Sequence, residues 1–186
     1  MSFVNTVEIV GDEALSTSII NRSITEIADN NLTKIGQYAF NSCRVLTKVD
    51  FPAVTSIGGY AFYSCRVLTK VDFPAVTSIG KSAFNSCRVL TKVDFPAVTS
   101  IGGYAFYSCA LTTVILRNET VCSLSSSDAF SSTPIKSGTG YIYVPRALLE
   151  DYKAATNWSN FAAQFRALED YTVDGTITGE LDTTKI

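Results

Sequence analysis

The apolar positions that follow Cys43 show two spacings in succession. Leu46, Val49 and Phe51 stand at an L-x-x-V-x-F spacing, and a charged residue lies on each side of the valine. Because side chains two residues apart point to the same face of a strand, this stretch predicts a short strand with one apolar face. Pro52 cannot donate a hydrogen bond to a neighbouring strand, so we expect the strand to end there and the chain to turn.

The apolar residues beyond the proline predict the rest of one coil. Val54 and Ile57 should return to the core, and the Gly58-Gly59 pair permits a sharp change of direction. The stretch "YAFYSC" that follows suits a single helical turn with its alanine and phenylalanine pointing inward. We therefore expect a strand, a turn, a second short segment and a helical turn.

This pattern recurs with a period of 22 residues. The stretch "CRVLTKVDFPAVTSIGGYAFYSC" begins at Cys43 and again, unchanged, at Cys87, and a third version lies between them. A degenerate copy precedes these from Ile24, and copies with a deletion and then with weaker identity follow as far as Ile135. A fixed period of this length is typical of a solenoid, in which stacked coils form a parallel sheet along one face.

The ends of the chain differ from the repeats, because the end coils of a stack would otherwise expose their core and strand edge. We expect residues 1–23 to form an N-terminal cap, 24–135 the repeats, 136–170 a C-terminal cap, and 171–186 a tail or linker. In the C-terminal cap, Pro145 suits the first position of a helix. An uncovered end would permit end-to-end self-association. The apolar face of this cap is supplied by Leu148, Leu149, Tyr152, Trp158, Phe161 and Phe165.

The repeated units resemble the leucine-rich repeats of the BspA-like family, in the matching runs that begin at Leu46, Leu68 and Leu90. The resemblance implies a right-handed leucine-rich-repeat solenoid with a parallel β-sheet face, short helical turns and a C-terminal strand-helix cap. The chain departs from better-known leucine-rich repeats at Val54 and its equivalents, where those proteins carry an asparagine ladder. We therefore expect a flatter stack.

The resemblance also implies a non-catalytic binding or adhesion module that presents its repeat surface to a protein or glycan partner, at the surface of a bacterium or on a prophage-encoded particle. The alternative is a structural spacer or capping component of a larger assembly such as a virion, without a ligand of its own. The first residues, "MSFVNTVEIV", have neither a basic start nor a continuous apolar run, so we expect no signal peptide. No apolar stretch approaches the roughly 20 residues of a membrane span.

Composition narrows the function further. The 186 residues include 15 Lys and Arg against 17 Asp and Glu, a net charge of −2, which gives no electrostatic reason to expect nucleic acid as a partner. Histidine is absent, and with it the usual general base and the common catalytic triads. A carboxylate-only or serine-lysine mechanism stays open, but we expect no enzyme, no cofactor and no metal site.

Cysteine recurs at one position of the repeat, at Cys43, Cys65, Cys87 and Cys109. Because cysteine is among the residues most often buried, we expect a column of packed, reduced thiols. A disulfide pair and a metal site are the alternatives. Cys122 lies in the weak last repeat and should also be packed.

Two groups of exposed residues are candidates for binding. The strand register predicts columns about 4.8 Å apart on the outer strand face, which are either a solvated charge ladder or a ligand surface. These columns are Lys48, Lys70 and Lys92, beside Asp50, Asp72 and Asp94. The second group occupies positions at which the copies differ from one another, and it consists of Tyr60, Tyr63, Tyr104 and Tyr107. Tyrosine offers contact area at a low entropy cost, which favours an adaptable binding patch, although relaxed surface positions after recent duplication would look the same.

Overall fold

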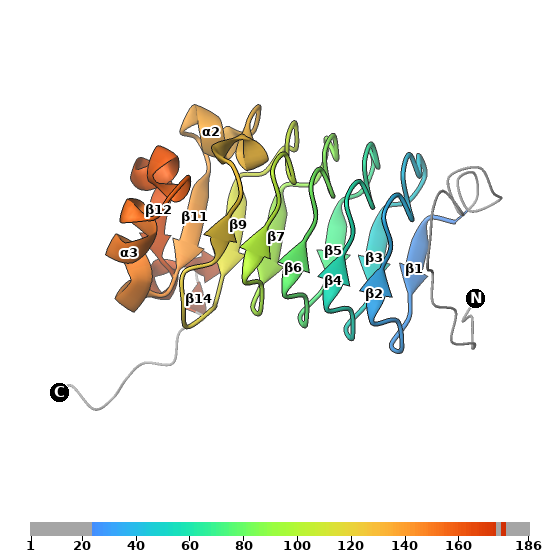
Figure 1. The fold of residues 1–186 in the computed structure, drawn as a ribbon, viewed down its shortest axis with the longest axis horizontal. Helices are drawn as coiled ribbons and strands as arrows, with labels where there is room; N and C mark the ends of the chain where they lie inside the picture. Colours follow the sequence, from blue (N-terminus) through green and yellow to red (C-terminus); the bar gives the residue numbers. More distant parts are fainter. Residues whose placement is uncertain (1–23, 174–175, 178–186) are drawn as a thin grey trace.

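The computed structural model describes residues 24–173 and 176–177. Its coils stack side by side along the long axis of the molecule (Figure 1), which is the solenoid that the 22-residue period predicts. The expected N-terminal cap, residues 1–23, lies outside the described residues, as does most of the expected tail. The boundaries drawn between repeats, caps and tail therefore stay predictions.

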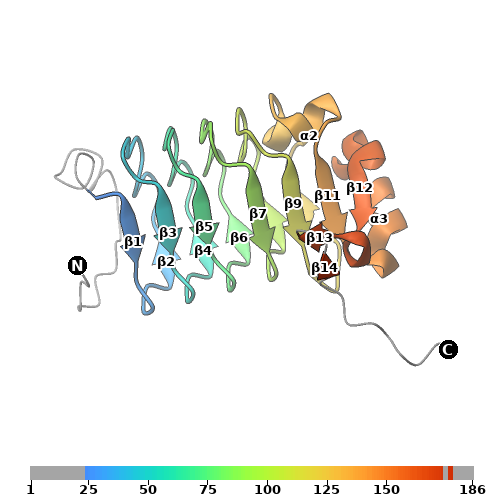
Figure 2. The same ribbon diagram turned by 180° about the vertical axis from the view of Figure 1, so that it is seen from behind.

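The predicted strand of each coil forms the first side of the solenoid, in the order that Figure 2 shows. One parallel ladder contains β1 (Glu26–Ala28), β3 (Lys48–Asp50) and β5 (Lys70–Asp72). A second contains β7 (Lys92–Phe95), β9 (Thr113–Leu116), β11 (Tyr141–Val144) and β12 (Phe165–Ala167). Within the first ladder Lys48 pairs with Lys70 and Asp50 with Asp72, as the charge columns require.

The second short segment of each coil is also a strand, so the solenoid has a second parallel sheet where the sequence predicted a sheet on one face. Its strands are β2 (Lys34–Ile35), β4 (Ser56–Ile57), β6 (Ser78–Ile79), β8 (Ser100–Ile101) and β10 (Ser123–Leu124). A threonine ladder runs beside them, because Thr55 Oγ1 donates to Thr33 O and Thr77 Oγ1 to Thr55 O. Hydroxyl groups thus supplement the backbone bonds between coils.

The segment expected to be a helical turn is instead a pair of hydrogen-bonded turns. Tyr63 N donates to Tyr60 O at 3.1 Å and Cys65 N to Phe62 O at 3.1 Å. The N–H groups that alternate with these donate to the next coil, as Phe62 N does to Ala83 O at 2.7 Å and Ser64 N to Asn85 O at 2.8 Å. A helix would keep all these donors within one coil, whereas the alternation joins neighbouring coils. In the last repeat the segment becomes the 3-10 helix η1 (Ser127–Phe130).

The core lies between the two sheets and is built from columns of identical side chains. Phe62 stacks on Phe40 with ring centroids 5.0 Å apart and on Phe84 at 5.1 Å, and the column continues through Phe106 to Phe130. Val54 and its equivalents are fully buried, as expected for a repeat without an asparagine ladder. Columns of stacked side chains form only if neighbouring coils lie close together, and glycine permits this at the tightest backbone contacts. A Cβ at Gly80, for example, would lie 2.5 Å from the backbone nitrogen of Gly59.

The C-terminal strand-helix cap covers the last coil. After α2 (Pro134–Ser137) and β11 it contains η2 (Arg146–Leu148), α3 (Leu149–Ala154) and η3 (Trp158–Gln164), and then β12. Trp158 Nε1 donates to Cys122 O at 2.6 Å, and Asn157 Nδ2 donates to Leu124 O at 2.7 Å. Side chains of the cap therefore satisfy carbonyl groups at the open edge of the second sheet.

The chain beyond the cap continues through η4 (Leu168–Asp170) to β13 (Thr172–Val173), which pairs in antiparallel fashion with β14 (Thr176–Ile177). This pairing is structure that the expectation of a linker did not include. In the described residues, no helix has the length and apolar character needed to cross a bilayer.

Candidate binding surfaces

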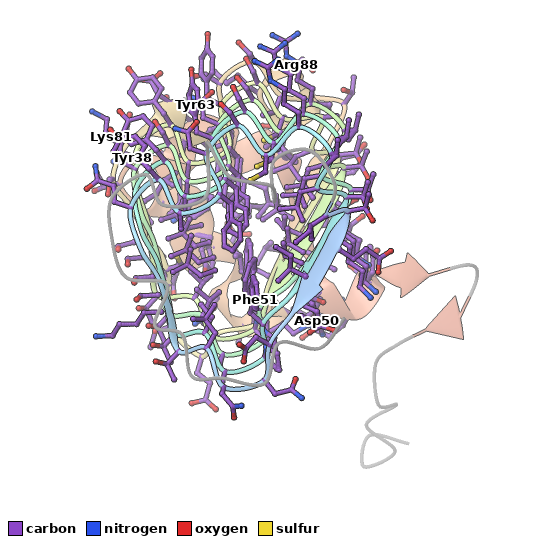
Figure 3. All side chains as sticks on the ribbon, turned by 90° about the vertical axis from the view of Figure 1, so that its right-hand side faces the viewer. Tyr38, Asp50, Phe51, Tyr63, Lys81 and Arg88 are labelled. Carbon is purple, nitrogen blue, oxygen red and sulfur yellow. The ribbon has the colours of Figure 1, made fainter. Side chains whose placement is uncertain are left out.

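The predicted charge columns lie on the outer face of the first sheet. Figure 3 looks along the solenoid and places Asp50 on this outer face, while Phe51, its neighbour in sequence, points into the core. Lys48 and Asp50 are half-buried, whereas Lys70 and Asp72 are exposed. Exposure therefore rises between β3 and β5, although the two strands have the same sequence.

The cause is an interruption of the ladder between β5 and β7. In the described part of the chain, no strand ladder joins these neighbours, although β6 and β8 of the same two coils pair in register. Val71 is consequently half-buried, whereas its equivalents Val49 and Val93 are fully buried.

A groove of about 550 Å³ opens at this interruption. Its lining contains four of the six predicted charge-column residues, together with two prolines and an arginine that the sequence analysis did not single out. The lining residues are Thr69, Lys70, Val71, Asp72, Pro74, Lys92, Asp94, Pro96 and Arg117. The remaining two column residues, Lys48 and Asp50, lie outside it.

The two walls of the groove differ in how their charges are satisfied. On the β7 wall, Arg117 makes a bidentate contact with Asp94, at 2.8 Å from Nη2 and 3.0 Å from Nε, and this carboxylate raises the pKa of the guanidinium. Lys92 Nζ lies 5.0 Å from the ring centroid of Tyr171. On the β5 wall, Lys70 and Asp72 have no side-chain partner among the described residues. Three cations against two carboxylates give the groove a formal charge of +1.

Arg117 and Tyr171 are the contacts that sequence reasoning missed. Phe95 pairs with Leu116 in the β7–β9 ladder, so Arg117 stands where the preceding coil has Pro96. This replacement of a repeated proline could have identified Arg117 from the sequence. Tyr171 gives no such signal, because its contact with Lys92 depends on the path that the chain takes after the cap.

The four predicted tyrosines form two pairs that are separated by one coil. Tyr60 and Tyr63 lie together with centroids 5.8 Å apart, and Tyr104 and Tyr107 form a second pair at 6.0 Å. The coil between them has serine and asparagine at these positions. Tyr38 joins the first cluster, because its ring stacks on Tyr60 at 5.0 Å with an interplanar angle of 14°. It occupies the same repeat position as Tyr60, which could have identified it.

The tyrosines lie away from the charge columns. In Figure 3, Tyr38 and Tyr63 project from one edge of the coils together with Lys81, and Asp50 projects from the other side. Tyr104 is 40% exposed, and the nearby Asp128 carboxylate raises the pKa of its hydroxyl. The molecule therefore has two separate candidate surfaces, one charged and one aromatic.

The cysteine column is confirmed as a set of free, buried thiols. Cys65 Sγ donates to Phe40 O at 3.0 Å, and Cys87 Sγ and Cys109 Sγ repeat this bond one and two coils later. Burial raises the pKa of Cys122 to about 12 and that of Cys87 well above its ordinary value. Thiols whose pKa is raised by burial do not act as nucleophiles near neutral pH.

Comparison with solved structures gives the same fold. A leucine-rich repeat protein from Bacteroides ovatus ATCC 8483 is 24% identical, with a TM-score of 0.58 over 84% of this chain and 44% of that one. The leucine-rich repeat protein of T. pallidum is 25% identical, with a TM-score of 0.55 over 65% of this chain and 58% of that one. A leucine-rich cell surface protein from Faecalibacterium prausnitzii A2-165 is 23% identical, with a TM-score of 0.55 over 80% of this chain and 36% of that one. The chain thus spans between about a third and three fifths of their lengths.

Sequence comparison identifies the family. Among curated proteins, no match was found. The sequence model of the BspA type leucine-rich repeat region matches residues 8–136 in six copies, which is more than half of the chain. This chain therefore belongs to the BspA-type leucine-rich repeat family.

Proposed function

We propose that this chain is a non-catalytic binding module that holds a protein partner on the outer face of the first sheet, in the groove between β5 and β7. Repeat proteins of this kind are generally surface or binding modules. The observation that supports this groove is the asymmetry of its walls. The charges of β7 are satisfied by Arg117 and Tyr171, whereas Lys70 and Asp72 have no side-chain partner among the described residues.

An extended peptide segment fits this arrangement. Lys70 and Asp72 are two residues apart on one strand, so their side chains project on the same side at the spacing of alternate residues in an extended chain. A partner strand with an acidic and a basic residue at that spacing would pair with both. Pro74, Pro96 and the exposed part of Val71 supply apolar contact beside these charges. Backbone N–H and C=O groups left without a ladder between β5 and β7 could donate and accept further hydrogen bonds.

The module would act at a cell surface, where one of its structural relatives is described as a leucine-rich cell surface protein. Adhesion is the role that we propose for it there. The alternative, a spacer or virion component without a ligand, would need no unsatisfied charges in a groove.

A capture experiment separates the two. The immobilised chain is exposed to bacterial and host surface extracts, retained proteins are identified and purified, and their affinities are measured. We expect the charge swap Lys70→Asp/Asp72→Lys to weaken a genuine partner at least about tenfold, which corresponds to about 1.4 kcal/mol. Lys81→Glu, on the aromatic side, is the control and should leave the affinity unchanged. Retention only of the chain itself or of virion proteins, or equal affinity for the swapped variant, would refute this function.

A further inference from the structure

The tyrosine side of the solenoid has an unusual backbone. Tyr38, Tyr60 and Tyr104 have φ values of 59°, 57° and 59°, in the left-handed region. This region is unfavourable for a bulky side chain, whereas glycine and asparagine adopt it readily. The third coil has Ser82 at the same position with φ 56°, so the coil can form without an aromatic residue there.

Burial does not explain why tyrosine occupies these strained positions. Tyr104 is 40% exposed, and Tyr38 and Tyr60 are only partly buried. The phenylalanines two residues after them, such as Phe62, are fully buried and form the core column. The tyrosine rings therefore add little to the core and instead form an outward-facing platform. A strained residue that contributes little to packing indicates a function.

Along the solenoid axis the platform has two adjacent aromatic coils, then a polar coil, then a third aromatic coil. Tyr60 and Tyr104 are two coils apart, which is about 10 Å at the usual strand spacing. The coil between them presents Lys81, which is exposed, and Asn85, which is half-buried. Asp128 lies beside the Tyr104 hydroxyl at the far end. The positive and negative side chains offset each other, so the platform carries little net charge.

We propose that this platform, Tyr38, Tyr60, Tyr63, Tyr104 and Tyr107, binds a linear, uncharged polysaccharide that lies along the solenoid axis. A pyranose ring has an apolar face of C–H groups, which packs on the negative π face of an aromatic ring. Its rim of hydroxyl groups needs amide, carboxylate and hydroxyl partners, which Asn85, Asp128 and the tyrosine hydroxyls supply. A polymer with a regular repeat also matches a protein surface that repeats in one direction.

This proposal is independent of the protein-binding groove, because the two surfaces lie on different sides of the coils (Figure 3). An acidic polysaccharide fits the platform less well, since Asp128 lies at one end of it. A protein partner that docks on the tyrosines is the competing interpretation, and the experiment is designed to detect it.

The test is electrophoresis of the full chain in native gels that contain mixed-linkage β-glucan, xylan or galactomannan. We expect at least one of these to retard the chain, and we expect Tyr60→Asn/Tyr104→Asn to weaken that binding at least tenfold. Tyr141→Asn is the matched control, because Tyr141 is 37% exposed but lies on the first sheet with an ordinary backbone. This control should migrate as the wild type does.

Stability provides a second readout. Asparagine tolerates the left-handed conformation, so the Tyr60→Asn/Tyr104→Asn variant should melt within a few degrees of the wild type. The buried Trp158, the one tryptophan of the chain, reports by its fluorescence that the cap is intact. If this variant were unstable, Tyr63→Asn/Tyr107→Asn, which leaves the left-handed positions untouched, should still reduce the retardation.

Three outcomes would overturn the proposal. They are free migration of the wild type in all three gels, equal retardation of a folded tyrosine variant, and loss of a captured protein partner in place of polysaccharide binding. The Lys70→Asp/Asp72→Lys variant should keep its polysaccharide binding. The experiments can therefore refute protein binding in the groove and polysaccharide binding on the platform independently of each other.

Discussion

The identical internal coils and the irregular C-terminal end satisfy their backbone groups in different ways. Many backbone N–H groups of the internal coils donate to a carbonyl of the neighbouring coil, as in the bond from Thr77 N to Thr55 O at 2.8 Å. At the end there is no next coil, and side chains such as Trp158 and Asn157 take its place. Repetition therefore makes a stack, and only a different sequence can end it.

The largest effect should come from the residue that ends the stack. Trp158 is fully buried, contacts Phe130 with centroids 5.8 Å apart and donates to Cys122 O. We expect Trp158→Ala to lower the free energy of unfolding by about 4 kcal/mol, since it removes a large core side chain and leaves a carbonyl unpaired. Urea unfolding followed by circular dichroism measures this.

Deletion of residues 66–87 is the contrasting change. It joins Cys65 to Arg88 and restores the repeat, so the shortened chain should remain soluble and melt cooperatively. By contrast, truncation from Tyr141 onward removes the cap and should cause aggregation or end-to-end pairing. A soluble, monomeric truncation beside a collapsed deletion would contradict the division between stack and cap.

A second pair of changes compares glycines in and beyond the region of close coil contact. A Cβ at Gly80 would lie 2.5 Å from Gly59 N, whereas a Cβ at Gly103 would have Ser126 Cβ as its nearest neighbour, at 3.6 Å. We expect Gly80→Ala to cost about 2 kcal/mol, because backbone must move, and Gly103→Ala to change stability by less than about 0.5 kcal/mol. Thermal unfolding of both variants would show whether coil spacing is as rigid as the identical columns require.

The repeat pattern predicted the core and the first strands because each depends on the spacing of apolar residues within one coil. Leu46, Val49 and Phe51 are all buried, and β3 has the expected position. The second sheet and the left-handed turns were not predicted, since they depend on backbone bonds between coils that no pattern within one coil contains. The substitution of Arg117 for a proline was visible in the sequence, but its contact with Asp94 was not.

The candidate groove, too, could be predicted from the sequence only in part. The charge columns followed from the strand register, but β5 and β7 have the same K-V-D sequence, so nothing in the repeat indicates a break between them. The two strands differ in their neighbours. β7 joins the longer ladder that runs through β9 into the cap, whereas β5 is the last strand of the ladder that contains β1 and β3. The site thus arises where the two ladders of the first sheet meet, between two regular coils.

The cap should also make stability depend on pH in the alkaline range. Tyr152 is buried in the cap, its hydroxyl accepts a hydrogen bond from Cys122 N at 2.9 Å, and burial raises its pKa from 10.0 to about 12. The folded chain therefore holds this proton more tightly than the unfolded chain. The stabilisation is complete below about pH 10 and is lost as the pH rises towards 12, by up to about 2 kcal/mol.

Tyr152→Phe tests this dependence on pH. The variant should lose about 1 kcal/mol near neutral pH, since Cys122 N loses its acceptor, and its free energy of unfolding should fall less steeply at alkaline pH. Denaturant titrations under reducing conditions, from about pH 8 to about pH 12, give the slope of the free energy of unfolding against pH for the variant and for the wild type. The buried thiols of Cys87 and Cys122 also contribute to the alkaline dependence, so equal slopes for the variant and the wild type would show that Tyr152 is not among the groups that titrate.

The smallest effect is expected where the two regions meet. The Arg117–Asp94 pair is exposed, with side-chain exposures of 40% and 35%, so Arg117→Ala should change the free energy of unfolding by less than about 1 kcal/mol. The same substitution frees Asp94 and changes the formal charge of the groove from +1 to 0. A protein partner held by Lys70 and Asp72 should then bind with altered affinity and a different salt dependence, although the fold is unchanged. A double-mutant cycle with Asp94→Asn measures the pair directly, and a coupling energy well above 1 kcal/mol would mean that this ion pair, and not the cap alone, holds the C-terminal ladder in place.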